Sequence, residues 1–199
     1  MKQDKINIRN LSLNEIKKAL SEMGEKPFRG TQIYEWLWQK DAHTFADMTN
    51  LSISLREKID AHFYIDHIEL KDQQISSDKT IKCAFSVDEN KVIEGVLIPT
   101  LSRTTACISS QIGCSLACKF CATGKLKLMR NLSAGEIVDQ VVYLRDQAVN
   151  RYKTNLSNIV YMGMGEPLLN YNNMLRSIDR ITSEDGLGIS PKRITVSTA

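Results

Sequence analysis

Three cysteines lie within eight residues in the middle of the chain, and no other feature constrains it as strongly. Cys114, Cys118 and Cys121 are separated by three and by two residues, and Ala122-Thr123-Gly124 follows directly. Thiolates are the usual protein ligands of iron–sulfur clusters. A cube-shaped cluster has four iron corners, so three thiolates leave one iron without a protein ligand. The spacing therefore predicts a [4Fe-4S] cluster whose open corner can bind a substrate or cofactor directly.

Two simpler uses of these cysteines fit less well. Structural zinc normally has four ligands, and every histidine of the chain lies far upstream of the cysteines. A redox pair at Cys118 and Cys121 would match the Cys-x-x-Cys rule, but it would leave Cys114 unexplained. Iron–sulfur ligation is therefore favoured over zinc binding and over dithiol chemistry.

The composition agrees with this chemistry and excludes other classes. At 199 residues the chain can bury a core and form one or two domains. Five cysteines, without a signal-like N-terminus, argue against a disulfide framework and favour the reducing cytoplasm. No apolar run approaches the length of a membrane helix. The net charge of +3 permits RNA binding without proving it, because a basic footprint depends on where the charges lie.

The first part of the chain is predicted to be helical. Ser12 and Glu15 form a capping-box pattern, and apolar residues recur at helical spacing until Gly24 ends the run. A second helix is expected to begin near Thr31, after a segment that proline and glycine interrupt. A third helix is expected over residues 52–62. These three segments predict a small helical domain.

This helical domain, residues 1–75, is a candidate for RNA contact. Arg29 and Lys40 could touch the RNA backbone, and nearby aromatic side chains could touch bases. The simpler alternative is that the aromatic residues are core and the charges a solvated face. For Trp36 and Trp38 we expect core positions, because large aromatic side chains dominate the packing of small domains.

Residues 76–100 have the pattern of a β-hairpin. Two loosely alternating segments, 81–87 and 92–98, flank the turn residues Asp88-Glu89-Asn90. Glu94 stands out as a carboxylate in an apolar strand. If it were buried, desolvation would raise its pKa and it could serve as a base. Taken alone, the residue pattern favours an exposed strand position.

Residues 101–199 alternate between strand and helix. Strands are expected over 104–109, 158–164 and 193–198, and helices from Ser133 and over 171–182. This alternation predicts an α/β fold with a parallel sheet. The cysteine loop and the turn Gly163-Met164-Gly165-Glu166-Pro167 both follow strands directly, which is where such folds place active sites.

These motifs together resemble the radical S-adenosylmethionine (SAM) superfamily and, within it, the RlmN family. The segments that carry the resemblance are the cysteine triad with the preceding Cys107-Ile108-Ser109-Ser110-Gln111-Ile112-Gly113, then Met162-Gly163-Met164-Gly165-Glu166-Pro167-Leu168, and then Arg193-Ile194-Thr195-Val196-Ser197-Thr198. RlmN-family enzymes methylate carbon 2 of an adenine in 23S ribosomal RNA and in certain transfer RNAs. The resemblance runs along the whole chain and implies a helical domain followed by the first part of a partial (β/α) barrel.

The resemblance implies how the cofactors are held. The cysteine triad would bind the [4Fe-4S] cluster, and its open iron would chelate the amino and carboxylate groups of SAM. Gly165, Glu166 and Ser197 would contact SAM, whose ammonium group needs acceptors such as carbonyls or a carboxylate. A glycine at such a turn lets the backbone approach a ligand closely.

The resemblance also implies two catalytic residues. One SAM would methylate a cysteine, and a second would supply a radical that abstracts hydrogen from the S-methyl group. The resulting carbon radical would add to carbon 2 of adenine. Glu94 would then take the ring proton, and Cys107 would form a disulfide with the methyl-carrying cysteine to release the product. Covalent catalysis suits carbon 2, which is a poor nucleophile, and the cofactor supplies the radical.

The chain departs from the family pattern because the methyl-carrying cysteine lies near the end of full-length members. This chain ends at Ala199, just after the third expected barrel strand, and Cys83 is in the wrong place to replace that cysteine. We expect Cys83 to be a strand residue that packs as a small hydrophobe. The chain is thus expected to be the N-terminal portion of a longer enzyme. Alone it should expose a strand edge and have no methyltransferase turnover.

Two alternative functions remain open. A related family methylates carbon 8 of the same ribosomal adenine and confers antibiotic resistance, although the pair Glu166-Pro167 favours carbon 2. The chain could also be an RNA-binding or iron–sulfur scaffold without catalysis. On the main interpretation the partners are 23S rRNA, tRNA and a one-electron reductant such as flavodoxin. The protein would be a cytoplasmic monomer that makes no use of a membrane.

Overall fold

The computed structural model describes residues 5–88, 91–116 and 118–199, and the chain forms two compact units. Unit 1 combines the chain up to His67 with Asp179–Gly188. Unit 2 combines Ile68–Ile178 with Ile189–Ala199. In the described residues no helix is both long and apolar enough to cross a membrane.

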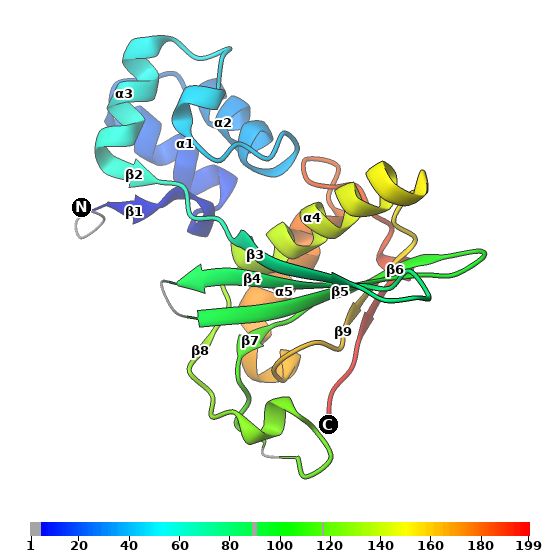
Figure 1. Cartoon of the computed structure of the whole chain (residues 1–199). Helices are drawn as coiled ribbons and strands as arrows, with labels where there is room; N and C mark the ends of the chain where they lie inside the picture. Colours follow the sequence, from blue (N-terminus) through cyan, green and yellow to red (C-terminus); the bar gives the residue numbers. More distant parts are fainter. Residues whose placement is uncertain (1–4, 89–90, 117) are drawn as a thin grey trace. The chain divides into compact units, whose positions relative to one another are not determined.

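Unit 1 is built from three helices and a short pair of parallel strands (Figure 1). These elements are α1 (Leu13–Glu22), α2 (Phe28–Trp38), α3 (Ile53–His62), β1 (Ile6–Asn7) and β2 (Phe63–Tyr64). The predicted capping box of α1 is confirmed, because the Ser12 hydroxyl accepts from the backbone N–H of Glu15 and the Glu15 carboxylate accepts from that of Ser12. Local sequence therefore fixes where the first helix begins.

The second helix begins at Phe28, so the expected start near Thr31 is wrong. Pro27 has φ −56° and ψ −30°, which is already a helical conformation. Proline is well tolerated at the start of a helix, because the N–H it lacks would have no partner there. The proline that suggested an interruption thus leads directly into the helix.

The two tryptophans of α2 occupy different environments. Trp38 is buried, and the guanidinium groups of Arg9 and Arg180 lie 4.7 and 5.3 Å from its ring centre. Trp36 is half-exposed: its indole N–H donates to Asn50 Oδ1 at 2.6 Å, and the Lys40 ammonium lies 4.3 Å from its ring centre. The predicted core position is confirmed for Trp38 and wrong for Trp36.

Unit 2 is organised around a six-stranded sheet in the order β10-β9-β6-β5-β4-β3. The strands are β3 (Glu69–Ile75), β4 (Ile81–Asp88), β5 (Lys91–Pro99), β6 (Thr104–Cys107), β9 (Asn158–Tyr161) and β10 (Ile194–Val196). Strands β3 to β6 pair antiparallel, whereas β6, β9 and β10 pair parallel. The α/β class is confirmed, and the sheet is mixed because the hairpin continues into the parallel strands.

The structure divides the chain at His67, before the boundary expected at residue 75. Strand β3 has the polar sequence Glu-Leu-Lys-Asp-Gln-Gln-Ile and is mostly exposed, yet it pairs with β4. An edge strand gains its hydrogen bonds from a neighbour and does not need an apolar face. The predicted strands within residues 76–100 are confirmed as β4 and β5 of the sheet. Of the turn predicted at Asp88-Glu89-Asn90, Asp88 is the last residue of β4, and residues 89–90 lie outside the described residues.

The sheet has one face covered by helices and one that carries the candidate catalytic residues. On the covered face Ile93, Gly95 and Leu97 of β5 are buried where α4 (Ala134–Tyr152) packs against the strand, as Figure 1 shows. Helix α5 (Tyr171–Thr182) reaches the same face through a hydrogen bond of 2.8 Å between the Tyr161 and Ser177 hydroxyls. Because successive strand residues alternate, Glu94 and Val96 point to the opposite face.

Candidate functional site

The cysteine triad lies on a loop that two short strands close at its base. β7 (Gln111–Ile112) pairs antiparallel with β8 (Arg130–Asn131). Gly113, directly after β7, has φ +76°, and a Cβ atom there would lie 2.1 Å from the Lys127 carbonyl oxygen. A side chain is therefore excluded both by backbone conformation and by space. The base of the loop is fixed, and its tip projects from the sheet.

The three cysteines of this loop are free and half-exposed. The backbone N–H of Gly124 donates to the Cys121 sulfur and lowers the pKa of that thiol, which favours the thiolate. In the described part of the chain, no three His, Cys, Asp or Glu side chains are close enough together to hold a metal ion. The three predicted ligand cysteines thus lie on one loop, but their sulfur atoms do not point toward a common metal position. Their chemistry, three free thiols on one short loop, still fits three-thiolate ligation of iron.

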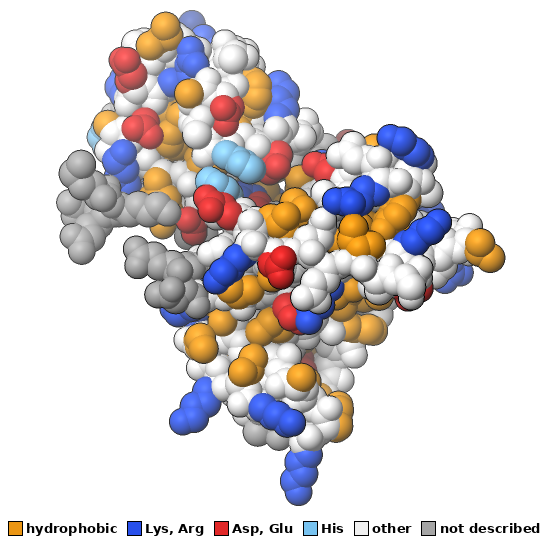
Figure 2. All heavy atoms as spheres, viewed as in Figure 1, with side chains coloured by type: hydrophobic (Ala, Val, Ile, Leu, Met, Phe, Trp, Pro, Cys, Tyr) orange, Lys and Arg blue, Asp and Glu red, His pale blue; other side chains and the backbone are white. Residues whose placement is uncertain are grey.

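The surface of the loop is both apolar and basic. Phe120 is 93% exposed, and Leu116 and Leu126 are also exposed. Figure 2 shows hydrophobic and Lys or Arg side chains together over this part of the molecule. Unlike the base, the tip is not held by a buried core.

The turn after β9 is held by the segment that follows β6. The Met164 N–H donates to the Ser109 hydroxyl at 2.8 Å, and the Ser110 N–H donates to the Met164 carbonyl at 2.9 Å. Gly165 has φ +95°, and a Cβ atom there would lie 2.5 Å from the Cβ of Gln111. The predicted SAM-contacting glycine is therefore a position where only glycine fits, because two backbone segments meet there.

Glu166 is buried, and its carboxylate accepts hydrogen bonds from the chain itself. The carboxylate accepts hydrogen bonds from the backbone N–H of Leu168 at 3.0 Å and from that of Ala199 at 3.1 Å. It also accepts a hydrogen bond from the Thr198 side chain. Burial alone would raise the pKa of Glu166, but these hydrogen bonds outweigh it and lower the pKa. The carboxylate thereby ties the turn after β9 to the segment after β10, which begins with the exposed Ser197.

Cys107 and Glu94 lie on the same face of the sheet. Cys107 pairs directly with Val96, so Glu94 is its diagonal neighbour across the strand pair, at roughly 7–8 Å between Cα atoms. Burial raises the pKa of the Cys107 thiol, and a hydrogen bond from the Met162 backbone N–H partly opposes this. Strand register thus brings together two residues that are thirteen positions apart in sequence.

Glu94 is not buried, so the condition for a desolvated base is not met. Its side chain is 46% exposed, and its carboxylate lies 2.6 Å from the ammonium of Lys82 on the neighbouring strand. The exposed strand position favoured by the residue pattern is the one that the structure has. Cys83, by contrast, is fully buried in β4, which confirms it as a small apolar core residue.

The candidate residues gather at one edge of the sheet. β6 ends at Cys107, β9 is followed by the turn at Gly163–Glu166, and β10 is followed by Ser197. Because the three strands are parallel, their carboxyl ends meet at the same edge. Active sites of such folds form at this edge. The structure thus brings together the cysteine loop, the Gly163–Glu166 turn and Ser197.

Sequence reasoning missed the buried polar residues that support this edge. Gln111 accepts from the Glu166 N–H at 2.8 Å and donates to Asn131 Oδ1 at 2.7 Å. Asn170 donates to the Ser110 and Leu132 carbonyls, both at 2.8 Å. A signal was available, because the polar residues Ser109-Ser110-Gln111 stand in a row soon after β6, separated from it only by Ile108. Buried polar side chains need partners, and here they join the loop base to the turn.

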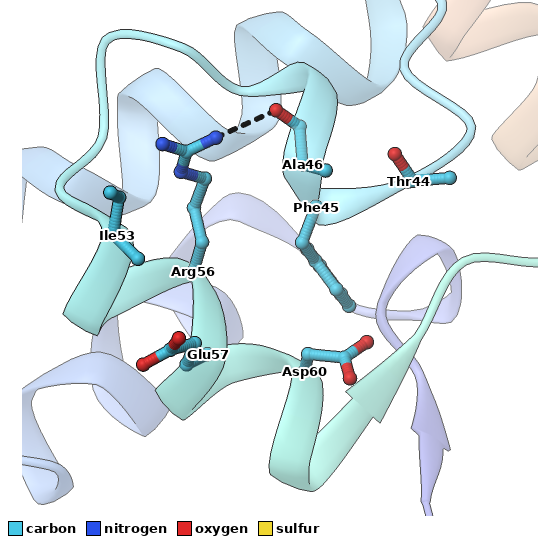
Figure 3. Close-up of a pocket in the computed structure, with 7 residues that line it drawn as sticks. All are labelled: Thr44, Phe45, Ala46, Ile53, Arg56, Glu57 and Asp60. Carbon is cyan, nitrogen blue, oxygen red and sulfur yellow. Dashed lines mark hydrogen bonds between the residues drawn. The ribbon is translucent and has the colours of Figure 1, made fainter.

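A separate hollow of about 530 Å³ lies in unit 1 between α3 and the turn at Phe45–Asp47 (Figure 3). The Arg56 guanidinium spans it and donates to the Ala46 carbonyl at 2.8 Å. The carboxylates of Glu57 and Asp60 stand on the opposite side, as Figure 3 shows. None of the predicted site residues lines this hollow.

Comparison with known proteins places the fold in a defined class. A crystal structure of a radical SAM methyltransferase from Sphaerobacter thermophilus superposes with a TM-score of 0.85 at 36% sequence identity. The match covers 97% of this chain and 57% of that protein. The fold is therefore that of part of a radical SAM methyltransferase, which confirms the predicted helical domain and partial barrel as a fold class.

The sequence is similar to that of RlmN proteins. The chain is 54% identical over its full length to a probable dual-specificity RNA methyltransferase RlmN of Christiangramia forsetii, of which it covers 56%. It is 42% identical to the dual-specificity RNA methyltransferase RlmN of Geotalea uraniireducens, of which it covers 55%. Residues 6–65 match the family described as ribosomal RNA large subunit methyltransferase N-terminal domain. The resemblance to the RlmN family is confirmed, and the chain spans about half the length of the curated relatives it matches.

Proposed function

We propose that this chain is part of a radical SAM methyltransferase that methylates carbon 2 of an adenine in 23S rRNA and in tRNA. The observation that carries the proposal is the meeting of three elements at one sheet edge: the cysteine loop, the Gly163–Glu166 turn and the segment at Ser197. The similarity to RlmN proteins supports the substrate and the reaction.

The cofactors are assigned to the loop and the two segments that face it. Cys114, Cys118 and Cys121 would hold a [4Fe-4S] cluster, which together with SAM supplies one-electron radical chemistry. Gly165 and Ser197 would contact SAM through backbone and hydroxyl groups. Glu166 already accepts hydrogen bonds from two parts of the chain, so it would position the SAM-binding turn as well as offer an acceptor.

The catalytic residues are assigned to the open face of the sheet. Glu94 would take the proton that leaves carbon 2, and the ammonium of Lys82 at 2.6 Å would position its carboxylate. Cys107 would release the product by forming a disulfide with a methyl-carrying cysteine that is not in this chain. Its partial burial keeps the thiol protonated until that step.

The partners and the cellular setting follow from this chemistry. Unit 1 would contact RNA with Arg29 and Lys40, the latter stacked on the half-exposed Trp36. A one-electron reductant such as flavodoxin would supply the electron. The protein would act in the cytoplasm, because thiolate-held iron needs a reducing compartment. It would act there as a monomer.

Anaerobic reconstitution with iron and sulfide, followed by SAM titration, tests the proposal. Electron paramagnetic resonance of the reduced protein should give a cluster signal that SAM perturbs. Replacing Cys114, Cys118 and Cys121 together by alanine should abolish it, whereas the control Cys83→Ala should keep it, because Cys83 lies outside the loop. A signal that survives loss of the triad would contradict the assignment. Mass spectrometry of methylated RNA would separate carbon 2 from carbon 8.

A further inference from the structure

A second polar hollow lies in unit 2 at the opposite edge of the sheet from the candidate site. The segments Ser102-Arg103, Ser157 and Ser190–Arg193 precede β6, β9 and β10. Because the three strands are parallel, their amino ends meet at one edge. Together with Asn158 these residues line a hollow of about 540 Å³. At about 3.3 Å per residue, strands of three or four residues separate the two edges by roughly 10 Å.

The hollow is strongly basic. Arg103, Lys192 and Arg193 line it, and among the residues that the structure describes no Asp or Glu does. Within residues 5–88, 91–116 and 118–199, neither the Arg103 nor the Lys192 side chain has an ion-pair partner. Cations this close repel one another unless an anion or water screens them. The hollow is therefore electrostatically suited to an anion.

The remaining groups are hydrogen-bond donors. Arg193 gives one N–H to the Ser157 carbonyl at 3.0 Å, which holds its guanidinium over the hollow and leaves its other donors available. The Ser157 hydroxyl accepts from the Thr104 N–H at 3.1 Å, so its own hydrogen can still be donated. Ser102 and Ser190 add two further hydroxyls at the rim. Guanidinium, ammonium and hydroxyl groups are the side-chain groups that contact phosphate oxygens in nucleic-acid complexes.

The hollow in unit 1 provides a contrast. Its single arginine, Arg56, shares the lining with Glu57 and Asp60, which would repel a phosphate. The basic hollow of unit 2 has three cations, and no carboxylate of the described part of the chain lines it. Figure 2 shows further Lys and Arg side chains on the visible face near the end of α4, so this part of unit 2 is basic beyond the hollow itself.

We infer that the hollow lined by Arg103, Lys192 and Arg193 binds backbone phosphate of the RNA substrate, away from the reacting adenine. The inference rests on the proposed function, because it takes RNA as the substrate. A polynucleotide is long enough to reach both edges of the sheet, whereas a single nucleotide at the carboxyl edge is not. The hollow would thus hold the RNA and contribute affinity without reading its sequence.

The test measures how tightly the 199-residue chain binds a fluorescently labelled RNA stem-loop. Fluorescence anisotropy gives the binding constant at a series of salt concentrations. The hollow variant combines Arg103→Ala, Lys192→Ala and Arg193→Ala. The matched control combines Lys71→Ala, Lys153→Ala and Arg176→Ala, which are exposed, belong to unit 2 and lie outside the hollow. Both variants lower the net charge from +3 to 0, as three cations are removed from each.

The two variants should differ clearly. The hollow variant should bind RNA roughly tenfold or more weakly at low salt, and the slope of log K against log salt should fall by about two to three, near 0.9 for each lost phosphate contact. The control should lose less than about one in slope. Equal losses in both variants would mean that only overall charge matters, and an unchanged hollow variant would also overturn the inference.

Other outcomes separate this inference from the proposed function. If the unchanged chain binds no RNA, the RNA substrate itself fails and the inference fails with it. If it binds RNA independently of the hollow, only the inference fails. Thermal unfolding with inorganic phosphate tests whether the hollow instead binds a free small anion. If phosphate stabilises the unchanged chain but not the hollow variant, and both bind RNA equally well, the hollow binds a small anion and the inference is contradicted.

Two further variants guard against misfolding. Arg103→Lys with Arg193→Lys keeps the charge and should keep most of the salt slope. Lys192→Glu changes a single exposed side chain and should weaken RNA binding more than Lys71→Glu does. Circular dichroism of each variant confirms that the fold is retained. If Lys192→Glu and Lys71→Glu weaken binding equally, the hollow has no special role.

Discussion

The cysteine loop and the Gly163–Glu166 turn meet at the same sheet edge but are held in opposite ways. The loop is closed at its base by β7 and β8, and its cysteines are half-exposed and do not converge. The turn is fixed by hydrogen bonds that its own N–H groups donate to the buried side chains of Ser109 and Gln111. The proposed SAM-binding backbone is thus built into the fold, whereas the proposed cluster ligands stand on a projection that metal binding would have to organise.

The base of the loop should be its most sensitive point. Gly113→Ala would combine left-handed strain of about 1–2 kcal/mol with overlap against the Lys127 carbonyl of about 1–3 kcal/mol. Gly24→Ala is the matched control, since Gly24 has φ +78° but open space at its Cβ position. Its cost should be about 1 kcal/mol. Urea unfolding followed by circular dichroism gives both values, and equal costs would mean that the loop base relaxes freely.

Breaking the hydrogen bonds that link the loop base to the Gly163–Glu166 turn should cause the next largest loss of stability. Gln111→Leu would remove the bond to the Glu166 N–H and the bond to Asn131, leaving buried polar groups without partners. The expected loss is about 2 kcal/mol of unfolding free energy. Gln74→Leu, on the exposed strand β3, should change stability by less than about 0.5 kcal/mol. A loss at Gln111 no larger than at Gln74 would show that loop and turn are not coupled.

The carboxylate of Glu166 should make the turn sensitive to acid. Its pKa in the folded chain lies below the ordinary value of 4.5, so its contribution to stability is fully present above pH 4.5 and is lost as the pH falls through the folded pKa. Glu166→Gln should therefore be less stable than the unchanged chain at neutral pH, with a difference that shrinks in acid. Unfolding curves recorded from neutral pH downward measure this, and parallel pH profiles would exclude such a role.

The tip of the loop should be the least sensitive. Phe120 is 93% exposed, so Phe120→Ser should change the unfolding free energy by less than about 0.5 kcal/mol. The buried Ile112, at the loop base, serves as the contrast, and Ile112→Ala should cost about 2–5 kcal/mol. Thermal unfolding compares the two. A large loss for Phe120→Ser would mean that the tip is packed against the rest of unit 2.

Features that depend on a few neighbouring residues could be predicted from sequence. The capping boxes Ser12–Glu15 and Ser133–Glu136 are both formed. The strands 81–87 and 92–98 are present with a small change in their ends. These elements are set by hydrogen bonds and side-chain alternation within a few residues, so no distant part of the chain was needed to specify them.

Other features could not be predicted, because distant residues decide them. Strand β3 has no apolar pattern and exists through pairing with β4. Helix α5 carries the neighbouring apolar residues Met174 and Leu175, and the structure buries Met174 but leaves Leu175 43% exposed. Helical periodicity defines a stripe on α5, but only the packed sheet decides which residues at its border are covered.

The sequence by itself determined the chemistry of the molecule: three thiols at fixed spacing, a glycine turn after a buried strand, and the alternation that predicts an α/β fold. Tertiary structure alone decided that Cys107 and Glu94 are diagonal neighbours, that Glu94 pairs with Lys82, and that three basic residues meet at the amino edge. The reason is that spacing within a motif is covalent, whereas strand register and order bring together residues that the chain itself keeps far apart.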